Sequence, residues 1–175
     1  MKSKPSKRPA KNRREAAASA APANTQIRTI LATTDFSAES LAGVRYAVAL
    51  AEKLGATVAL LHAVEPASRL SGMESVVLAR EDSDVVALAR AQLATLAKRE
   101  GTGDLAVTFS VSVRTGNPFH AITTAAREQT AELMVIATHG HTGAERVLLG
   151  STAERVLRHA PCPMLVVRER EKEFA

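Results

Sequence analysis

The sequence predicts an α/β fold, a doubly wound five-stranded parallel sheet in the order 3-2-1-4-5 with helices on both faces. Five apolar runs alternate with segments of helical periodicity between residues 27 and 168. The fourth run, Leu133–Thr138, is apolar throughout, which is typical of a strand covered on both faces. Because each parallel crossover leaves the sheet and returns to it, the intervening helices are expected on both faces.

The first strand is expected at Ile27–Thr33, a short β-branched run. The next segment has apolar residues at helical spacing and a glycine at the expected end of the helix. These residues are Leu41, Val44, Val48, Ala51 and Leu54, followed by Gly55. A second strand is predicted at Thr57–Ala63.

The middle of the chain is predicted to contain a loop, a helix and a strand. Residues 64–81 hold Pro66 and Gly72, which favour a loop. A helix is expected over about 83–99, ending at Gly101, and the alternating run Ala106–Val113 predicts the third strand.

The last part of the chain predicts two more helices and two more strands. Asn117 and Pro118 favour a helix start, with Asn as N-cap and Pro at the first helical position. Its inward residues are expected to be Phe119, Ile122 and Ala126. The fourth strand is followed by a glycine-bearing loop, a short helix from Ser151 to about Arg158, and a fifth strand, Met164–Arg168.

The positive charge of the chain lies in its first 25 residues. The net charge of +5 divides into +6 for residues 1–25, with seven basic residues and one acid, and −1 for the other 150 residues. Low hydrophobicity and repelling charges predict a disordered tail over 1–25. The domain is expected at 26–170, with a short charged end at 171–175. Solvation and weak contact with a polyanion are both open as roles of the tail.

Several protein classes do not fit the composition. No apolar run reaches the roughly 18 residues of a membrane-spanning helix, and the tail lacks the apolar core of a secretory signal. The single cysteine, Cys162, excludes a disulfide framework within the chain. Aromatic residues are 3% and Trp is absent, which leaves little for base stacking on single-stranded nucleic acid. We expect a cytoplasmic protein with no membrane contact.

Two loops carry unusual chemistry, and they follow the first and fourth strands. Thr33, Thr34 and Asp35 follow the first, and 138–143 follow the fourth. These strands are neighbours at the point where the strand order reverses, where such sheets bind ligands. Gly150 and Ser151 open a helix whose first amides attract anions. Two alternatives are open: Ser151 and Glu154 form a capping box, and Asp35 or Ser37 caps the helix that follows it.

Three segments resemble a known family. They are ILATTDFSAESLAGVRYAVALAEKLGATVALLHAVEP, RTGNPFHAI and ATHGHTGAERVLLGSTAERVLRHAPCPMLVV. From Ile27 to Arg168 the chain resembles the universal stress protein family (UspA-type domain). The resemblance implies a five-stranded doubly wound fold, usually a homodimer and often paired through the last strand, here Met164 to Arg168. In one branch it implies ATP binding through Gly, two residues, Gly, nine residues, then Gly with Ser or Thr.

The resemblance transfers to individual positions with two departures. Gly140, the nine residues 141–149 and Gly150-Ser151 match, whereas Ala137 stands at the first glycine and Thr33 at the usual proline. If position 137 needs only a small residue, binding survives; if it needs a positive φ, affinity falls. The implied site faces base, ribose and phosphates with these residues: Thr33, Thr34, Asp35, Ala63, Ala137, Gly140, Gly143, Gly150, Ser151 and Thr152.

The sequence shows no catalytic apparatus. It lacks the P-loop lysine and a paired-carboxylate motif for Mg²⁺. His139 and His141 flank Gly140 without a convergent set of metal ligands. His62 and Cys162 are interpreted as core or rim residues. The leading hypothesis is an ATP-binding stress regulator or sensor that is not an enzyme, with Mg or Mn as an optional companion ion. The alternatives are an interaction module without nucleotide and a slow ATPase.

Overall fold

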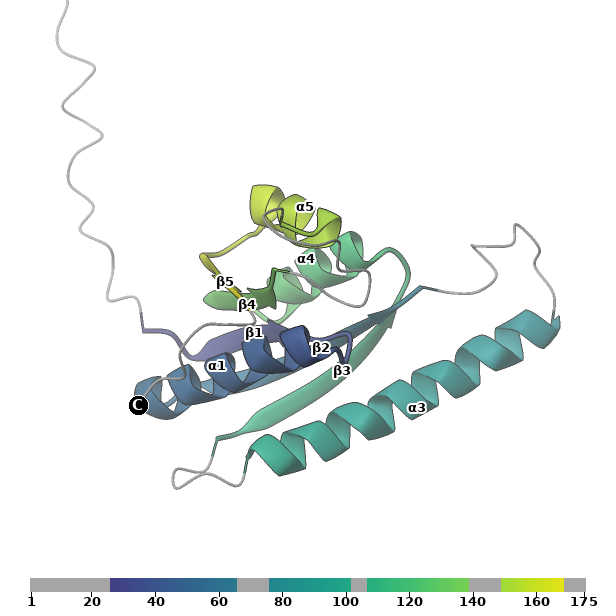
Figure 1. Ribbon diagram of the computed structural model, residues 1–175, viewed down its shortest axis with the longest axis horizontal. Helices are drawn as coiled ribbons and strands as arrows, with labels where there is room; N and C mark the ends of the chain where they lie inside the picture. Colours follow the sequence, from purple (N-terminus) through teal and green to yellow (C-terminus); the bar gives the residue numbers. More distant parts are fainter. Residues whose placement is uncertain (1–25, 66–75, 102–106, 139–148, 169–175) are drawn as a thin grey trace, which may run out of the picture.

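The computed structural model describes residues 26–65, 76–101, 107–138 and 149–168. Its five strands form one sheet in the order β3-β2-β1-β4-β5, and every neighbouring pair is parallel, as predicted (Figure 1). The strands are β1 (Thr29–Thr33), β2 (Thr57–Val64), β3 (Phe109–Thr115), β4 (Leu133–Ala137) and β5 (Met164–Val167).

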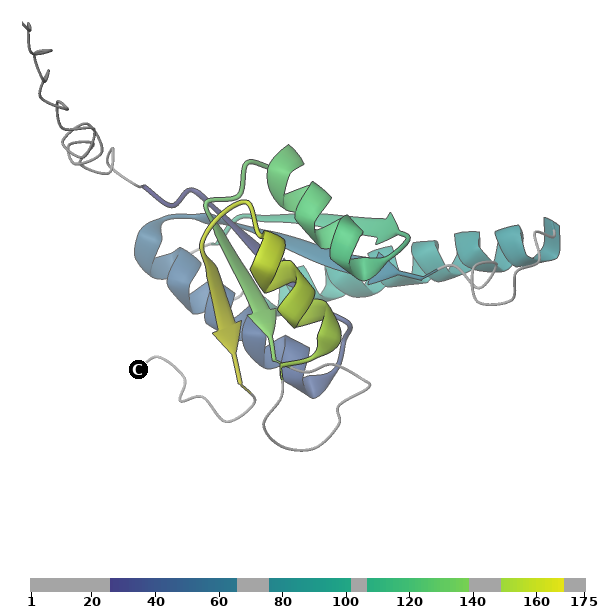
Figure 2. The ribbon, with the colours of Figure 1, turned by 90° about the horizontal axis from the view of Figure 1, so that it is seen from above.

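Helices cover both faces of the sheet, as the sequence predicts (Figures 1 and 2). One face carries α1 (Ala38–Leu54) and α3 (Val76–Glu100), and the other carries α4 (Pro118–Glu128) and α5 (Ser151–His159). Each face has its own apolar core. Ile30 and Ala32 of β1 belong to the first core and Leu31 to the second, because successive side chains of a strand point to opposite faces.

Two helix ends are formed by the residues that the sequence predicts for them. Gly55 ends α1 in the left-handed conformation (φ 66°), with its N–H bonded to the Ala51 carbonyl. Asn117 caps α4 by accepting from the Phe119 N–H at 3.1 Å, and Pro118 is the first helical residue. Ile122 and Ala126 are buried as expected, and Phe119 is half-buried against the same core.

Three predicted elements begin at the wrong residue, and one of them also ends later than predicted. The helix expected from about residue 83 begins at Val76, within the predicted loop 64–81, because residues 76–82 (VVLARED) continue the helix despite the earlier Pro and Gly. The third strand, expected at Ala106–Val113, begins at Phe109 and continues to Thr115, since its ladder with β2 runs on to Val64. The first strand begins at Thr29, opposite Thr57, rather than at Ile27.

The amino ends of β1 and β4 are tied together by one carboxylate. Glu132 Oε2 accepts hydrogen bonds from the backbone N–H groups of Thr29 (2.8 Å) and Arg28 (3.2 Å). Glu132 also donates its own N–H to the Thr29 carbonyl at 3.1 Å. These contacts lie at the amino edge of the sheet. They therefore fix β1 and β4 at the edge opposite the loops that follow these two strands.

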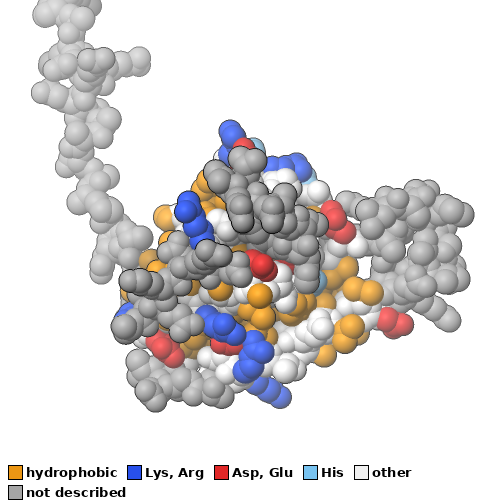
Figure 3. Space-filling view, viewed as in Figure 1, with side chains coloured by type: hydrophobic (Ala, Val, Ile, Leu, Met, Phe, Trp, Pro, Cys, Tyr) orange, Lys and Arg blue, Asp and Glu red, His pale blue; other side chains and the backbone are white. Residues whose placement is uncertain are grey.

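The solvent side of α3 is partly apolar. Val85 is 47% exposed and Leu88 is 61% exposed, and Figure 3 shows hydrophobic side chains along this helix. In the described part of the chain, no helix has the length and apolar character needed to cross a membrane. The predicted tail 1–25, the end 171–175, the glycines Gly140 and Gly143, and the histidines His139 and His141 lie outside the described residues.

Candidate functional site

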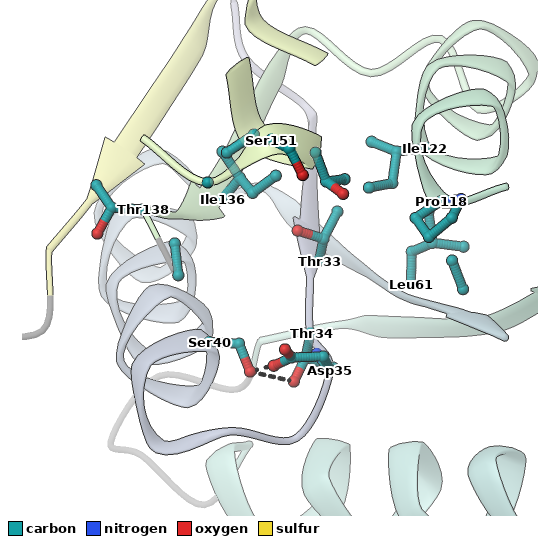
Figure 4. Close-up of a pocket in the computed structure, with 15 residues that line it drawn as sticks. Thr33, Thr34, Asp35, Ser40, Leu61, Pro118, Ile122, Ile136, Thr138 and Ser151 are labelled. Atoms are coloured by element: carbon teal, nitrogen blue, oxygen red, sulfur yellow. Dashed lines mark hydrogen bonds between the residues drawn. The ribbon is translucent and has the colours of Figure 1, made fainter. Parts of the chain in front are cut away.

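A cavity of about 200 Å³ opens at the carboxyl ends of β1 and β4 (Figure 4). This is the edge where the strand order reverses, as the sequence predicts. Three helices begin around it, because α1 follows β1, α4 follows β3 and α5 follows β4. The lining residues are Thr33, Thr34, Asp35, Ser40, Leu61, Ala63, Pro118, Ile122, Ile136, Ala137, Thr138, Gly150, Ser151, Thr152 and Ala153.

Eight of the ten predicted site residues line this cavity, and the other two, Gly140 and Gly143, lie outside the described residues. Most of the other lining residues belong to strands or helices that the sequence had already placed at the site. Ile136 of β4 and Ala153 of α5 are examples. Pro118 and Ile122 come instead from α4, where the sequence predicted a helix start for Pro118 and a core position for Ile122. Ser40 could have been found from its spacing, three residues after the helix cap Ser37.

The turn between β1 and α1 is fixed by its own side chains. Ser37 is the N-cap of α1, and its hydroxyl accepts from the Ser40 N–H at 3.2 Å. Asp35 Oδ1 accepts from the N–H (3.1 Å) and the hydroxyl (2.5 Å) of Ser37. Of the two capping candidates, Ser37 therefore caps the helix, and Asp35 braces that cap while lining the cavity.

Thr34 is buried, and it connects the turn to both neighbouring elements. Its N–H donates to the Leu61 carbonyl at 3.0 Å, and its hydroxyl lies 2.9 Å from the Ser40 hydroxyl (Figure 4). The same hydroxyl accepts from the Phe36 N–H at 2.9 Å. Phe36 has a φ of 67°, a conformation that side chains rarely adopt, so the surrounding contacts must hold it there.

His62 of β2 contacts this turn from the side. Its Nδ1 lies 2.7 Å from the Thr34 carbonyl oxygen, and its ring centroid lies 4.7 Å from that of Phe36. His62 was interpreted as a core or rim residue, and the structure places it half-buried with a hydrogen bond.

The start of α5 differs from the predicted capping box. Gly150 is the N-cap and Ser151 the first helical residue, and within the described ranges no side chain caps this start. Glu154 instead accepts from Arg158 Nη2 at 2.7 Å, one turn along the helix. The capping-box alternative is therefore wrong, because the helix starts one residue earlier than that motif requires. The first-turn amides belong to Ser151, Thr152 and Ala153, which line the cavity.

Gly150 allows a close approach between α5 and the end of β4. Its N–H donates to the Thr138 carbonyl at 2.8 Å, and a Cβ at this position would lie 3.1 Å from that oxygen. Thr138 in turn donates its N–H to the Val167 carbonyl at 2.9 Å. The helix is thus anchored to β4 and, through Thr138, to β5.

Ala137, the departure from the glycine pattern, ends β4 with no positive φ. Val135, two residues earlier, belongs to the core under α1, so the Ala137 methyl points to that face. Gly43 of α1 lies opposite, and a Cβ built there would be 3.9 Å from the Ala137 Cβ. The backbone at position 137 therefore does not require glycine, and the methyl is directed toward α1.

The profile of the universal stress protein family matches residues 26–168, most of the chain. The chain belongs to the universal stress protein family. Universal stress protein MJ0531 of Methanocaldococcus jannaschii is 32% identical over 151 residues, which cover 82% of this chain and 84% of that protein. A universal stress protein of Thermus aquaticus is 31% identical over 81% of this chain and 98% of its own length.

Solved universal stress proteins share the fold. UspA from Lactobacillus plantarum superposes with a TM-score of 0.71 at 25% identity, over 82% of this chain and 99% of its own. A universal stress protein solved in complex with cAMP is 26% identical, with a TM-score of 0.54, over 82% of this chain and 98% of that one.

Cys162 has a shifted pKa in this universal stress protein, and it lies outside the cavity lining. Burial, and secondarily the charge of Glu132, raises the pKa of the half-buried Cys162 thiol above its ordinary value. Cys162 packs against the core between the sheet and α4–α5, as expected. Across the described ranges, no three His, Cys, Asp or Glu residues come together as metal ligands.

Proposed function

We propose that this universal stress protein binds an adenine nucleotide, ATP, in the cavity at the ends of β1 and β4, and acts as a stress-response regulator or sensor without catalysis. The observation that carries the proposal is the start of α5. Its first three residues line the cavity and have no side-chain cap among the described residues, whereas both other helices that begin there are capped by side chains.

The phosphates are assigned to α5. Unpaired N–H groups and the helix dipole attract anions at a helix N-terminus. The hydroxyls of Ser151 and Thr152 lie in the same turn and add donors. Glycine at position 150 lets the helix start pack against Thr138 without a side chain between the amides and the ligand.

The base and ribose are assigned to the β1–β2 side. β1 ends at Thr33, opposite Leu61, while β2 continues to Val64. Backbone groups of alternate residues point to the same side of a parallel strand. The Leu61 carbonyl points toward β1, so the N–H and C=O of Ala63 point the same way, beyond the end of β1. They suit the hydrogen-bonding edge of adenine, and the Asp35 carboxylate suits a ribose hydroxyl.

The cavity volume agrees with placing the base and ribose inside the cavity and the phosphates at its mouth. Sites that enclose a whole drug-sized ligand measure roughly 300–1,000 Å³. At about 200 Å³, the cavity fits the nucleoside, with the phosphates at its mouth beside Ser151. The relative solved in complex with cAMP supports an adenine nucleotide as ligand class.

Three further assignments complete the proposal. Pairing through β5 (Met164–Val167) gives a homodimer, because β5 is an edge strand of the described sheet and an edge strand can pair with a second sheet. Sedimentation velocity tests this, and a monomer at micromolar concentration contradicts it.

The protein is assigned to the cytoplasm. Mg or Mn accompanies ATP through its phosphates rather than through a resident protein site.

Titration of the purified, nucleotide-stripped protein with ATP tests the central proposal. Saturable binding by calorimetry, with adenosine binding more weakly than ATP, is the expected result. The absence of saturable binding at millimolar ATP contradicts it. Phosphate release measured on the same samples tests the non-enzymatic assignment, and release above background that disappears in Asp35→Ala overturns it.

A further inference from the structure

The peptide group between Thr34 and Asp35 is held from both sides. Its carbonyl oxygen, on Thr34, lies 2.7 Å from His62 Nδ1, and its N–H, on Asp35, lies 3.3 Å from the Ser40 hydroxyl. One contact comes from β2 and the other from α1. Because this peptide precedes the Asp35 Cα, its orientation sets the direction in which the Asp35 side chain leaves the backbone.

The His62 contact defines a tautomer. A carbonyl oxygen only accepts hydrogen bonds, so Nδ1 of His62 carries a proton and donates it. The imidazole ring also packs on Phe36, the residue with the positive φ, at 4.7 Å between centroids. His62 therefore restrains the residues on both sides of Asp35, namely Thr34 by a hydrogen bond and Phe36 by ring packing.

We propose that His62 is a positioning residue of the nucleotide site: its Nδ1–H fixes the Thr34 carbonyl and so aims the Asp35 carboxylate into the cavity. This inference rests on the proposed nucleotide binding and extends it to a side chain outside the cavity lining. Without the Nδ1 donor, the half-buried carbonyl loses its partner, and the turn is free to relax from the uncommon conformation at Phe36.

The expected effect is specific to the nucleoside half of the ligand. A single hydrogen bond of this kind corresponds to an affinity change of about 3- to 10-fold. Since the phosphates are assigned to α5, adenosine, AMP and ATP are expected to weaken by the same factor. A smaller folded fraction would weaken all three ligands by one factor as well, so the folded fraction of each variant is measured by circular dichroism before the titrations.

Two substitutions separate the donor from the ring. His62→Phe keeps the ring against Phe36 and removes the donor. His62→Asn places an amide N–H close to the position of Nδ1 and removes the ring. A matched control is His159→Phe, since His159 Nδ1 also contacts a carbonyl, that of Arg155 at 2.9 Å, and its ring also packs on a phenylalanine, Phe119, far from Asp35.

Calorimetric titration of the full chain and its variants with adenosine, AMP and ATP tests the proposal. We expect His62→Phe to bind all three about 3- to 10-fold more weakly, and His62→Asn and His159→Phe to stay within about twofold of the wild type. Binding by His62→Phe equal to the wild type overturns the proposal, as does His62→Asn weakened as much as His62→Phe. No binding by the wild type contradicts the nucleotide site itself.

A measurement without ligand covers the case in which a variant does not fold. Long-range ¹H–¹⁵N spectra of the wild-type protein above neutral pH distinguish the two neutral tautomers of histidine. The expected pattern for His62 is a proton on Nδ1. A proton on Nε2 alone would remove the hydrogen bond on which the proposal depends.

Discussion

Two helix starts face each other across the cavity, and they are built in opposite ways. At α1, Ser37 caps the first turn and Asp35 braces Ser37, so the local side chains satisfy the helix start. At α5, the N-cap is Gly150, and among the described residues no side chain caps the first turn. The start of α1 is thus stabilised by its own side chains, whereas the start of α5 is the place where the proposed nucleotide phosphates would bind.

Gly150→Asp adds a side-chain cap to the start of α5 and is expected to have the largest effect on ATP binding. The new carboxylate accepts from the first-turn amides and repels phosphate, so ATP affinity falls by about 100-fold while adenosine affinity changes little. Gly150→Ala is the matched control, because it adds the same Cβ, 3.1 Å from the Thr138 carbonyl, without charge. Calorimetry with both ligands checks this, and equal losses for ATP and adenosine would contradict the assignment of phosphates to α5.

Asp35→Ala changes the side of the cavity at the capped start of α1. It removes the proposed ribose contact and the brace on Ser37, so ATP and adenosine are both expected to bind about tenfold more weakly. Asp84→Ala, on the exposed side of α3, removes the same charge away from the cavity. A loss confined to ATP would place Asp35 on the phosphates instead.

Ser37→Ala and Asn117→Ala remove the side-chain caps of α1 and α4. Each is expected to lower the free energy of unfolding by about 1 kcal/mol, as typical cap losses do. Ser37→Ala should also weaken nucleotide binding a few-fold, because Asp35 loses the hydrogen bond from the Ser37 hydroxyl. Thermal unfolding and ATP titration measure the two effects, and unchanged binding in Ser37→Ala would show that Asp35 does not need this brace.

Ala137→Gly is expected to have the smallest effect on binding. The position has no positive φ and its methyl points toward α1, so ATP affinity should stay within about twofold. Stability should fall by roughly 0.5–1 kcal/mol, the usual loss for glycine within a strand. A large gain in ATP affinity would show that Ala137 weakens the site, which favours the alternative of an interaction module without nucleotide.

The strand order and the location of the site were predictable because they follow from patterns that persist along the chain. Apolar runs such as Leu133–Thr138 mark strands, and parallel topology brings the ends of neighbouring strands together. Eight candidate residues therefore line one cavity. Boundaries were less accurate: VVLARED is compatible with loop or helix until its neighbours are known, and the structure extends α3 to Val76.

Local sequence did not decide between the alternative caps at the two helix starts. Ser151-Thr-Ala-Glu154 has the spacing of a capping box, and only the observed start at Gly150 excludes it. The link between His62 and Thr34 joins residues 28 positions apart in the chain, so it depends on the pairing of β1 with β2. No local pattern indicates such a contact.

If the cavity binds a purine as proposed, the extra length of β2 gives it a basis for choosing between adenine and guanine. Beyond Thr33, the C=O and N–H of Ala63 form an acceptor and a donor in a fixed order along the strand. The edge of adenine carries the complementary pair, an amino donor beside a ring-nitrogen acceptor. Guanine carries the reverse order, so its carbonyl oxygen would face the Ala63 carbonyl and its N–H would face an N–H. The difference of three residues between two neighbouring strands thus disfavours guanine without any side chain taking part.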